Sequence, residues 1–129
     1  MLLALAGARY RLIDVDLAVP RCERSIDFRR DSRFLEVPVL IDGANRICQS
    51  NQILAYLSHK LGGFSGSSEA ERLRIGEWLF WESNRIGFSV SNLCFYRRFR
   101  APISGELESF LNSRAIEDLS VLDAALWQD

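Results

Sequence analysis

Two short segments place polar groups where a small anionic molecule could be held. Ser50 directly follows Gln49 at the point where an apolar-periodic helix begins, so Ser50 is a good N-cap residue. The start of a helix attracts anions, because its first amides lack intrahelical acceptors and the helix dipole is positive there. Val37-Pro38 stands before a compact β-branched run. Taken singly, Pro38 as a simple strand start and Ser50 as a simple cap are the favoured interpretations, because such caps are common.

Other reactive side chains favour structural roles. His59 is the single histidine and falls in the last turn of the same predicted helix, which favours capping over a role in a Ser-His-Asp site. The three cysteines, Cys22, Cys48 and Cys94, have no Cys-x-x-Cys or zinc-binding spacing, and we expect them to be buried or incidental. The arginine cluster at 97–100 is typical of a solvated helix end rather than a phosphate site.

The elements that would position these residues begin with a small α/β unit. Apolar and polar residues alternate after Tyr10, which predicts a strand, and Gly7 is a helix stop signal. The turn-rich sequence 42–45 joins two short β runs into a hairpin. In chain order, the predicted elements are a helix end (residues 1–8), a strand (10–17), a connecting loop with a short irregular helix (18–36) and two hairpin strands (38–41 and 46–49).

The second half of the sequence is helical. Ser68 and Glu71 form a capping box, in which each side chain satisfies a free amide near the other residue. A Gly/Ser-rich linker over 62–67 precedes this box, and Pro102 ends the helix that follows it. Ser104 can cap a last helix. The predicted helices therefore cover residues 50–61, 68–100 and 104 to near the end of the chain.

Composition bounds the class of protein. The chain has 129 residues, a formal net charge of −1 and 48% hydrophobic residues, which is an ordinary globular composition. Balanced charge gives no field that would recruit nucleic acid or an anionic membrane. No apolar run approaches the length that spans a bilayer, and few scattered cysteines fit a reducing cytoplasm.

Two motifs in this order resemble one protein family. The segments are Val-Pro-Val-Leu-Ile-Asp-Gly over 37–43 and Gln-Ser-Asn-Gln-Ile-Leu-Ala-Tyr-Leu over 49–57. Together they resemble the N-terminal, thioredoxin-like domain of cytosolic glutathione transferases, of a bacterial type. The resemblance implies an α/β thioredoxin-like N-terminal unit followed by an all-α helical segment. It places a partial glutathione-binding domain at 1–63 and a partial helical domain at 64–129, with the first strand of the family missing and the chain truncated at both ends.

The resemblance implies roles for individual residues. In this family the proline at the position of Pro38 is cis, the backbone of the residue at Val37 holds the cysteinyl part of glutathione, and the residues at Gln49 and Ser50 hold its γ-glutamyl end. The helix that follows contributes to a pocket for an apolar electrophile, for which Trp78 and Trp81 are candidates. At helical spacing, core packing and subunit contact are the simpler roles for these two rings. The implied partners are glutathione as co-substrate, a small electrophile and a second copy of the chain, with no metal or other cofactor.

The resemblance also contains departures. The family's catalytic Tyr, Ser or Cys would lie before Met1, so no residue of this chain is assigned that role, and we expect little or no transferase activity. Glu36 stands near the position expected for the glycyl carboxylate of glutathione, which it would repel unless Arg33 or Arg46 compensates. A non-catalytic transferase-fold module for interaction or regulation is therefore the alternative. A glutaredoxin-like redox domain is weaker, because Cys-x-x-Cys is missing.

Overall fold

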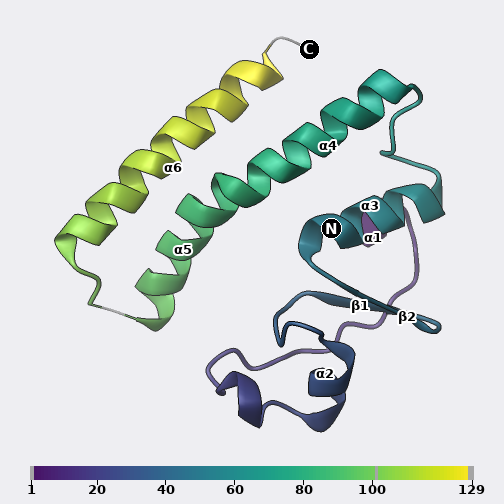
Figure 1. Cartoon of the computed structure of the whole chain (residues 1–129), viewed down its shortest axis with the longest axis horizontal. Helices are drawn as coiled ribbons and strands as arrows, with labels where there is room; N and C mark the ends of the chain where they lie inside the picture. Colours follow the sequence, from purple (N-terminus) through teal and green to yellow (C-terminus); the bar gives the residue numbers. More distant parts are fainter. Residues whose placement is uncertain (1, 101, 128–129) are drawn as a thin grey trace. The chain divides into compact units, whose positions relative to one another are not determined.

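The chain forms two units, each with its own internal contacts. A computed structural model describes residues 2–100 and 102–127, and contacts divide the chain into residues 1–75 and 76–129 (Figure 1). The sequence predicts a domain boundary after residue 63, and this boundary stays a prediction. The predicted domains, 1–63 and 64–129, begin and end with residues 1 and 128–129, which lie outside the described residues. The elements are α1 (Leu2–Leu5), a 3-10 turn (Arg21–Glu23), α2 (Ile26–Asp31), β1 (Val39–Asp42), β2 (Asn45–Cys48), α3 (Ser50–Leu61), α4 (Glu69–Asn84), α5 (Ile86–Phe99) and α6 (Gly105–Leu126).

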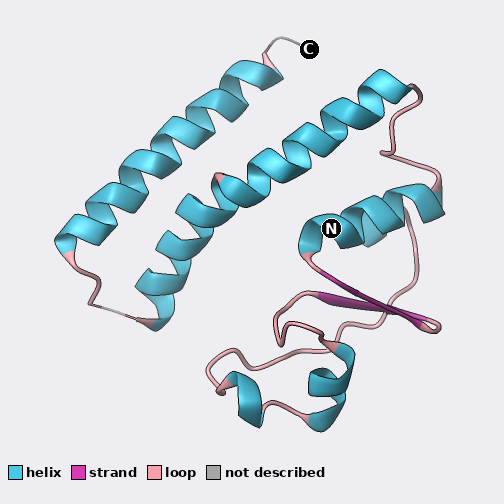
Figure 2. Cartoon of the chain, in the orientation of Figure 1, coloured by secondary structure: helices cyan, strands magenta, loops and turns pink. Residues whose placement is uncertain are grey.

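The hairpin predicted in the first unit is present. β1 and β2 pair antiparallel with Val39 opposite Cys48 and Asp42 opposite Asn45, one residue displaced from the predicted ranges (Figure 2). Gly43 in the two-residue turn has φ +58°, a left-handed conformation that glycine adopts without steric cost. α1 and both strands contact α3, whose Ile53 and Leu57 side chains are buried. The hairpin is therefore held against one helix.

The strand predicted at residues 10–17 is wrong. The structure has irregular backbone there, and the described residues contain only one sheet, made of β1 and β2. Three of the large apolar side chains of this segment are mainly exposed: Tyr10 by 56%, Leu12 by 77% and Ile13 by 59%. A strand needs a neighbour to satisfy its backbone groups, and neither β1 nor β2 pairs with this segment. Alternation alone therefore did not produce a strand.

The predicted helix ends are confirmed where side chains or glycines fix them. The amides of Gly7 and Ala8 donate to the carbonyls of Ala4 (3.1 Å) and Leu3 (3.0 Å), the pattern of a Schellman motif. α3 ends at Gly62 in a left-handed conformation. α4 begins with the capping box, since the Glu71 amide donates to Ser68 Oγ at 3.2 Å and the Ser68 amide donates to Glu71 Oε2 at 3.4 Å.

The helix predicted over 68–100 is interrupted at Arg85, which has φ −110° and ψ −71° and separates α4 from α5. Around this point three polar side chains donate to the carbonyl four residues earlier: Ser83 to Leu79, Asn84 to Phe80 and Ser89 to Arg85. Such bonds compete with the helical backbone and bend helices. This local competition explains why the continuous apolar pattern does not give one continuous helix.

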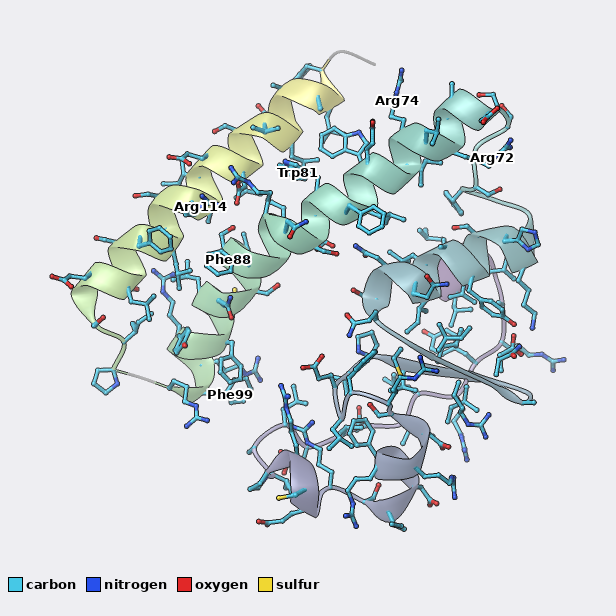
Figure 3. All side chains as sticks on the ribbon, in the orientation of Figure 1. Arg72, Arg74, Trp81, Phe88, Phe99 and Arg114 are labelled. Carbon is cyan, nitrogen blue, oxygen red and sulfur yellow. The ribbon has the colours of Figure 1, made fainter. Side chains whose placement is uncertain are left out.

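α5 and α6 form the packed pair of the second unit. Their core consists of Leu93, Leu111 and Ala115, and Phe88 meets Phe110 edge to face at 6.3 Å (Figure 3). Two polar residues also lie in this core. Asp118 is 0% exposed, accepts from Arg85 Nε at 3.0 Å and lies 2.9 Å from Ser89 Oγ, so the buried carboxylate has a charged partner.

Candidate functional site

The hairpin register brings the predicted binding residues to one end of the sheet. Val37 and Pro38 directly precede Val39, and Gln49 and Ser50 directly follow Cys48. Since Val39 and Cys48 are opposite each other, the two pairs of residues leave the hairpin on the same side. Residues eleven to thirteen positions apart in the sequence are therefore neighbours in the fold.

The Val37–Pro38 peptide bond is cis, as the family resemblance implied. The Val37 side chain is 42% exposed. Within residues 2–100 and 102–127, no hydrogen bond to the Val37 backbone N–H or carbonyl is found. This backbone is therefore able to pair with an extended ligand.

Two residues of the predicted loop over 18–36, whose role sequence reasoning missed, hold the backbone before Val37 in place. Ser32 is only 1% exposed; its hydroxyl donates to the Glu36 carbonyl at 2.9 Å and accepts from the Glu36 amide at 3.0 Å. Arg24 Nη1 donates to the Leu35 carbonyl at 3.0 Å, and Leu35 has φ +55°. Neither Ser32 nor Arg24 belongs to a motif, so only their position in the polar loop before Pro38 could have suggested this role.

The Glu36 carboxylate has a partner that the sequence did not suggest. Arg21 Nη2 lies 3.0 Å from Glu36 Oε1, whereas Arg46 Nε lies 3.0 Å from Asp31 Oδ1. Arg33 forms no ion pair or hydrogen bond among the described residues. The two arginines proposed to compensate Glu36 therefore do not, and Arg21 does.

Ser50 is the first residue of α3 rather than its N-cap. Gln49 occupies the N-cap position, and its carbonyl accepts from the Ile53 amide at 3.0 Å. Gln49 has φ +71° and ψ 123°, which a residue with a Cβ rarely adopts. Strained residues of this kind persist where the surroundings fix them and cluster at ligand sites. The expectation that Ser50 caps the helix is wrong, but Ser50 still lies at its positive end.

The remaining candidates lie elsewhere. Trp78 and Trp81 are on α4, in the second unit, with ring centroids 5.1 Å apart at 81°, and their role in an electrophile pocket stays a prediction. Cys22 and Cys94 are exposed and Cys48 is half-buried, so burial is wrong, and the alternative that these cysteines are incidental stays a prediction. In the described ranges, no group of His, Cys, Asp or Glu is arranged to hold a metal ion. Helices long and apolar enough to cross a membrane are likewise not found in these ranges.

Comparisons with known proteins point to one family. Residues 1–59 match the family model described as glutathione S-transferase, N-terminal domain. Mouse (Mus musculus) glutathione S-transferase Mu 6 is 44% identical over 48 residues, 37% of this chain and 22% of the relative. Human (Homo sapiens) Mu 3 is 40% identical over 50 residues, 39% and 22% of the two chains. Rabbit (Oryctolagus cuniculus) Mu 1 is 48% identical over 62 residues, 48% and 28% of the two chains.

These matches set the extent of the likeness. The matched part spans between 22% and 28% of the length of these three relatives. All three are mammalian Mu-class proteins, whereas the sequence motifs suggested a resemblance to a bacterial type of transferase. No solved structure matches the chain significantly. The predicted fold class is confirmed as a thioredoxin-like α/β unit followed by a helical segment. Residues 1–59 of this chain are therefore similar in sequence to the N-terminal domain of glutathione S-transferases.

Proposed function

We propose that the first unit binds glutathione at the hairpin end where Val37, Pro38, Gln49 and Ser50 meet. The observation that carries this proposal is the register of β1 and β2, which makes neighbours of the two sequence motifs. The family match over residues 1–59 covers all four residues.

Each residue has a distinct task in this proposal. The unpaired Val37 backbone accepts from and donates to the extended cysteinyl part of glutathione, as in strand addition. The γ-glutamyl carboxylate lies at the start of α3, where the helix dipole and the Ser50 hydroxyl stabilise a negative charge. The Gln49 side chain binds the same end of the tripeptide. Arg21 offsets the charge of Glu36, which otherwise would repel the glycyl carboxylate.

The reaction of the whole protein is proposed from the family. The thiol of glutathione, the co-substrate, loses its proton to solvent, and the thiolate attacks an electrophilic carbon of a small molecule. As the carbon–sulfur bond forms, that carbon's bond to a leaving group breaks or its π bond opens, and the electron pair moves away from the carbon. None of the Ser, Tyr and Cys residues of this chain is assigned to stabilise that thiolate. We therefore expect the 129-residue chain to bind glutathione and to have little or no transferase activity. We further propose that the protein forms a homodimer in the cytoplasm and that Trp78 and Trp81 contribute to the pocket for the electrophile.

Calorimetry tests glutathione binding directly. Ser50→Ala should weaken binding about tenfold, since a hydrogen bond to a charged group contributes about 1.5 kcal/mol. Ser113→Ala, on an exposed part of α6, is the matched control and should leave binding unchanged. No binding by the unaltered chain, or equal binding by the two variants, would overturn the proposal. Robust turnover of a standard electrophile would separately overturn the expected lack of activity.

A non-catalytic interaction module is the second candidate. Glu36 is the residue behind this candidate, because an acidic residue beside the Val37 backbone is a poor neighbour for the glycyl carboxylate wherever Arg21 does not offset its charge. If the folded chain shows no heat of binding with glutathione, the module is the better description.

A further inference from the structure

The outer edge of β2 is an unpaired strand edge. β2 pairs only with β1 in the part of the chain that the structure describes. Asp42 and Asn45 close a two-residue turn and form a hydrogen-bonded pair, so by alternation Leu40 and Ile47 form the next one. The backbone N–H and C=O groups of Arg46 and Cys48 consequently point away from β1. Such groups are a template for another extended chain.

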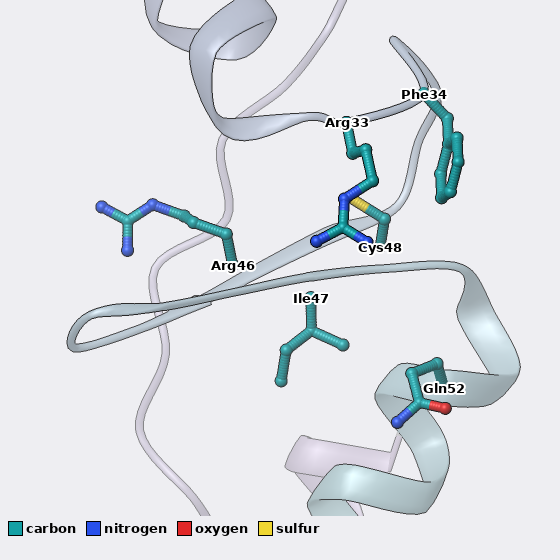
Figure 4. Close-up of a pocket in the computed structure, with 6 residues that line it drawn as sticks. All are labelled: Arg33, Phe34, Arg46, Ile47, Cys48 and Gln52. Carbon is teal, nitrogen blue, oxygen red and sulfur yellow. The ribbon is translucent and has the colours of Figure 1, made fainter.

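A cavity lies along this same edge (Figure 4). Its volume is about 260 Å³, and Figure 4 shows Arg33, Phe34 and Cys48 on one side of β2 with Ile47 and Gln52 on the other. Arg33 and Phe34 come from the loop before β1, and Gln52 comes from α3. The two sides of the edge therefore differ, with a cation and an aromatic ring on one and an aliphatic side chain and an amide on the other.

Only one of the two lining arginines carries an uncompensated charge. Arg46 Nε donates to Asp31 Oδ1 at 3.0 Å, and Arg46 Nη1 donates to the Gly43 carbonyl at 2.8 Å. The hydrogen bonds and charges of Arg30 and Arg46 hold the pKa of Asp31 below its ordinary value. Arg33 has no such partner among the described residues. The charge that remains for a ligand therefore belongs to Arg33, next to Cys48.

We propose that the β2 edge binds an extended segment of a partner protein in which an acidic residue has an apolar residue on each side. The segment adds antiparallel as a third strand. Its acidic residue pairs with Cys48, so that the carboxylate faces Arg33. Side chains alternate between the faces of a strand, so the flanking apolar residues face Ile47. Main-chain bonds provide the affinity, and the two unlike sides of the cavity provide the specificity.

This docking site is separate from the proposed glutathione site. Neither Val37 nor Ser50 lines the cavity, and Arg33 has no role in the glutathione proposal. An interaction module requires an exposed surface of this kind, whereas a glutathione enzyme does not require it. The two proposals can therefore fail independently.

A short peptide tests the proposal on the unaltered chain. The probe is the peptide Ser-Ser-Val-Glu-Val-Ser-Ser, acetylated at its N-terminus and amidated at its C-terminus. Its binding to the chain is measured by the fluorescence anisotropy of a labelled copy. Methylating the glutamate amide removes the hydrogen that should bond the Cys48 carbonyl, so binding should be lost. Methylating the second valine amide, which points away from β2, should leave binding unchanged. Equal binding of the two methylated peptides, or no binding of the parent peptide, would overturn the proposal.

Charge variants give a second, independent measurement. Arg33→Ala should weaken peptide binding about three- to fivefold, the range of an exposed ion pair. Arg29→Ala removes the same charge from an exposed position on α2 and should have no effect. Replacing the peptide glutamate with lysine should weaken binding more than Arg33→Ala does, because repulsion then replaces the attraction. Saturating glutathione should not displace the peptide; displacement would place the peptide in the glutathione site and overturn the separate docking site.

Discussion

Gln49 carries backbone strain at the point where β2 leads into α3. Its φ of +71° is unfavourable for any side chain with a Cβ, yet the chain must turn there from β2 into α3. Glycine would make this turn with less strain, so the Gln49 side chain does not favour this backbone conformation, and its proposed role is in binding glutathione. Stability and binding should therefore respond in opposite directions when Gln49 is changed.

Gln49→Gly should raise the free energy of unfolding by about 0.5–1 kcal/mol, because relief of the positive φ exceeds the added freedom of the unfolded chain. The same change should weaken glutathione binding, because the amide is lost. Gln49→Ala is the matched control: it also loses the amide but keeps the Cβ, so binding falls without a gain in stability. Urea denaturation and calorimetry measure the two effects. A Gly variant no more stable than the Ala variant would contradict this account of the strain.

Among the elements, α4 owes its first turn to a loop glycine as well as to its capping box. Gly66 has φ +74°, and a Cβ there would lie 3.0 Å from Glu71 Cβ and 3.1 Å from the Arg72 amide nitrogen. Glu71 Oε2 accepts from the Ser67 amide at 2.6 Å and from the Ser67 hydroxyl at 2.7 Å. These bonds, with that from the Ser68 amide, lower the pKa of Glu71. Gly66 thus leaves room for the glutamate that caps the helix.

Gly66→Ala should lower the free energy of unfolding by about 1–2 kcal/mol, through the positive φ and the crowded capping box. Gly76→Ala is the matched control on the same helix, where a Cβ would meet nothing within 4 Å. This control should instead raise the free energy of unfolding by about 0.5–1 kcal/mol, since alanine is the better helix former. Helical circular dichroism during urea unfolding measures both. Changes of the same sign in the two variants would contradict the role given to Gly66.

The Asp42 carboxylate links the hairpin to α3 by hydrogen bonds. Asp42 Oδ2 accepts from Lys60 Nζ and, at 2.6 Å, from the Tyr56 hydroxyl, both on α3. The hydrogen bond from Lys60, followed by that from Tyr56, holds the pKa of Asp42 below its ordinary value of 3.8. A lowered folded-state pKa means that this contribution to stability is complete above about pH 4 and is lost as pH falls through the folded-state pKa.

The stability of the unaltered chain should therefore fall between about pH 4 and pH 2 more steeply than that of Asp42→Asn, which cannot lose this proton. Asp31 and Glu71 also have lowered pKa values, so both proteins should lose some stability in acid. The difference between the two chains isolates Asp42. The measurement is the urea midpoint at steps of pH from 6 to 2. Parallel curves for the two chains would show that the Asp42 bonds do not link hairpin and helix.

At this scale the sequence predicted elements well where local chemistry decides them. The turn around Gly43, the stop at Gly62 and the Ser68–Glu71 box each depend on a few adjacent residues, and each is present. A strand at 10–17 would need a partner strand from elsewhere in the chain, and neither β1 nor β2 pairs with it. An uninterrupted helix over 68–100 would need polar side chains that do not bond the helix carbonyls, whereas Ser83, Asn84 and Ser89 do so. At the site, the motifs indicated Val37, Pro38, Gln49 and Ser50. The contacts of Ser32, Arg24 and Arg21 come from tertiary packing, which spacing does not encode.

The whole molecule has a small core for its composition. Of the described apolar residues, only five are buried, two on α3 and three on the α5–α6 pair. Large side chains stay exposed on the same helices, among them Phe95 and Phe99, whose ring centroids are 5.4 Å apart. Contiguous exposed apolar surface of this kind binds apolar dyes and promotes association. On α5, buried residues should therefore stabilise the contact with α6, whereas exposed residues should mainly affect dye binding.

Replacing Phe95 and Phe99 with serine should reduce binding of the dye ANS while changing the free energy of unfolding by less than about 0.5 kcal/mol, since neither ring is buried. Leu93→Ala, on the buried face of the same helix, should lower the free energy of unfolding by about 2–3 kcal/mol and increase ANS binding, because the cavity it leaves loosens the contact with α6. ANS fluorescence and urea unfolding on the same samples separate the two effects. If the double serine variant unfolds as easily as Leu93→Ala, the two rings belong to the core of the second unit, and the small core inferred for the molecule is wrong.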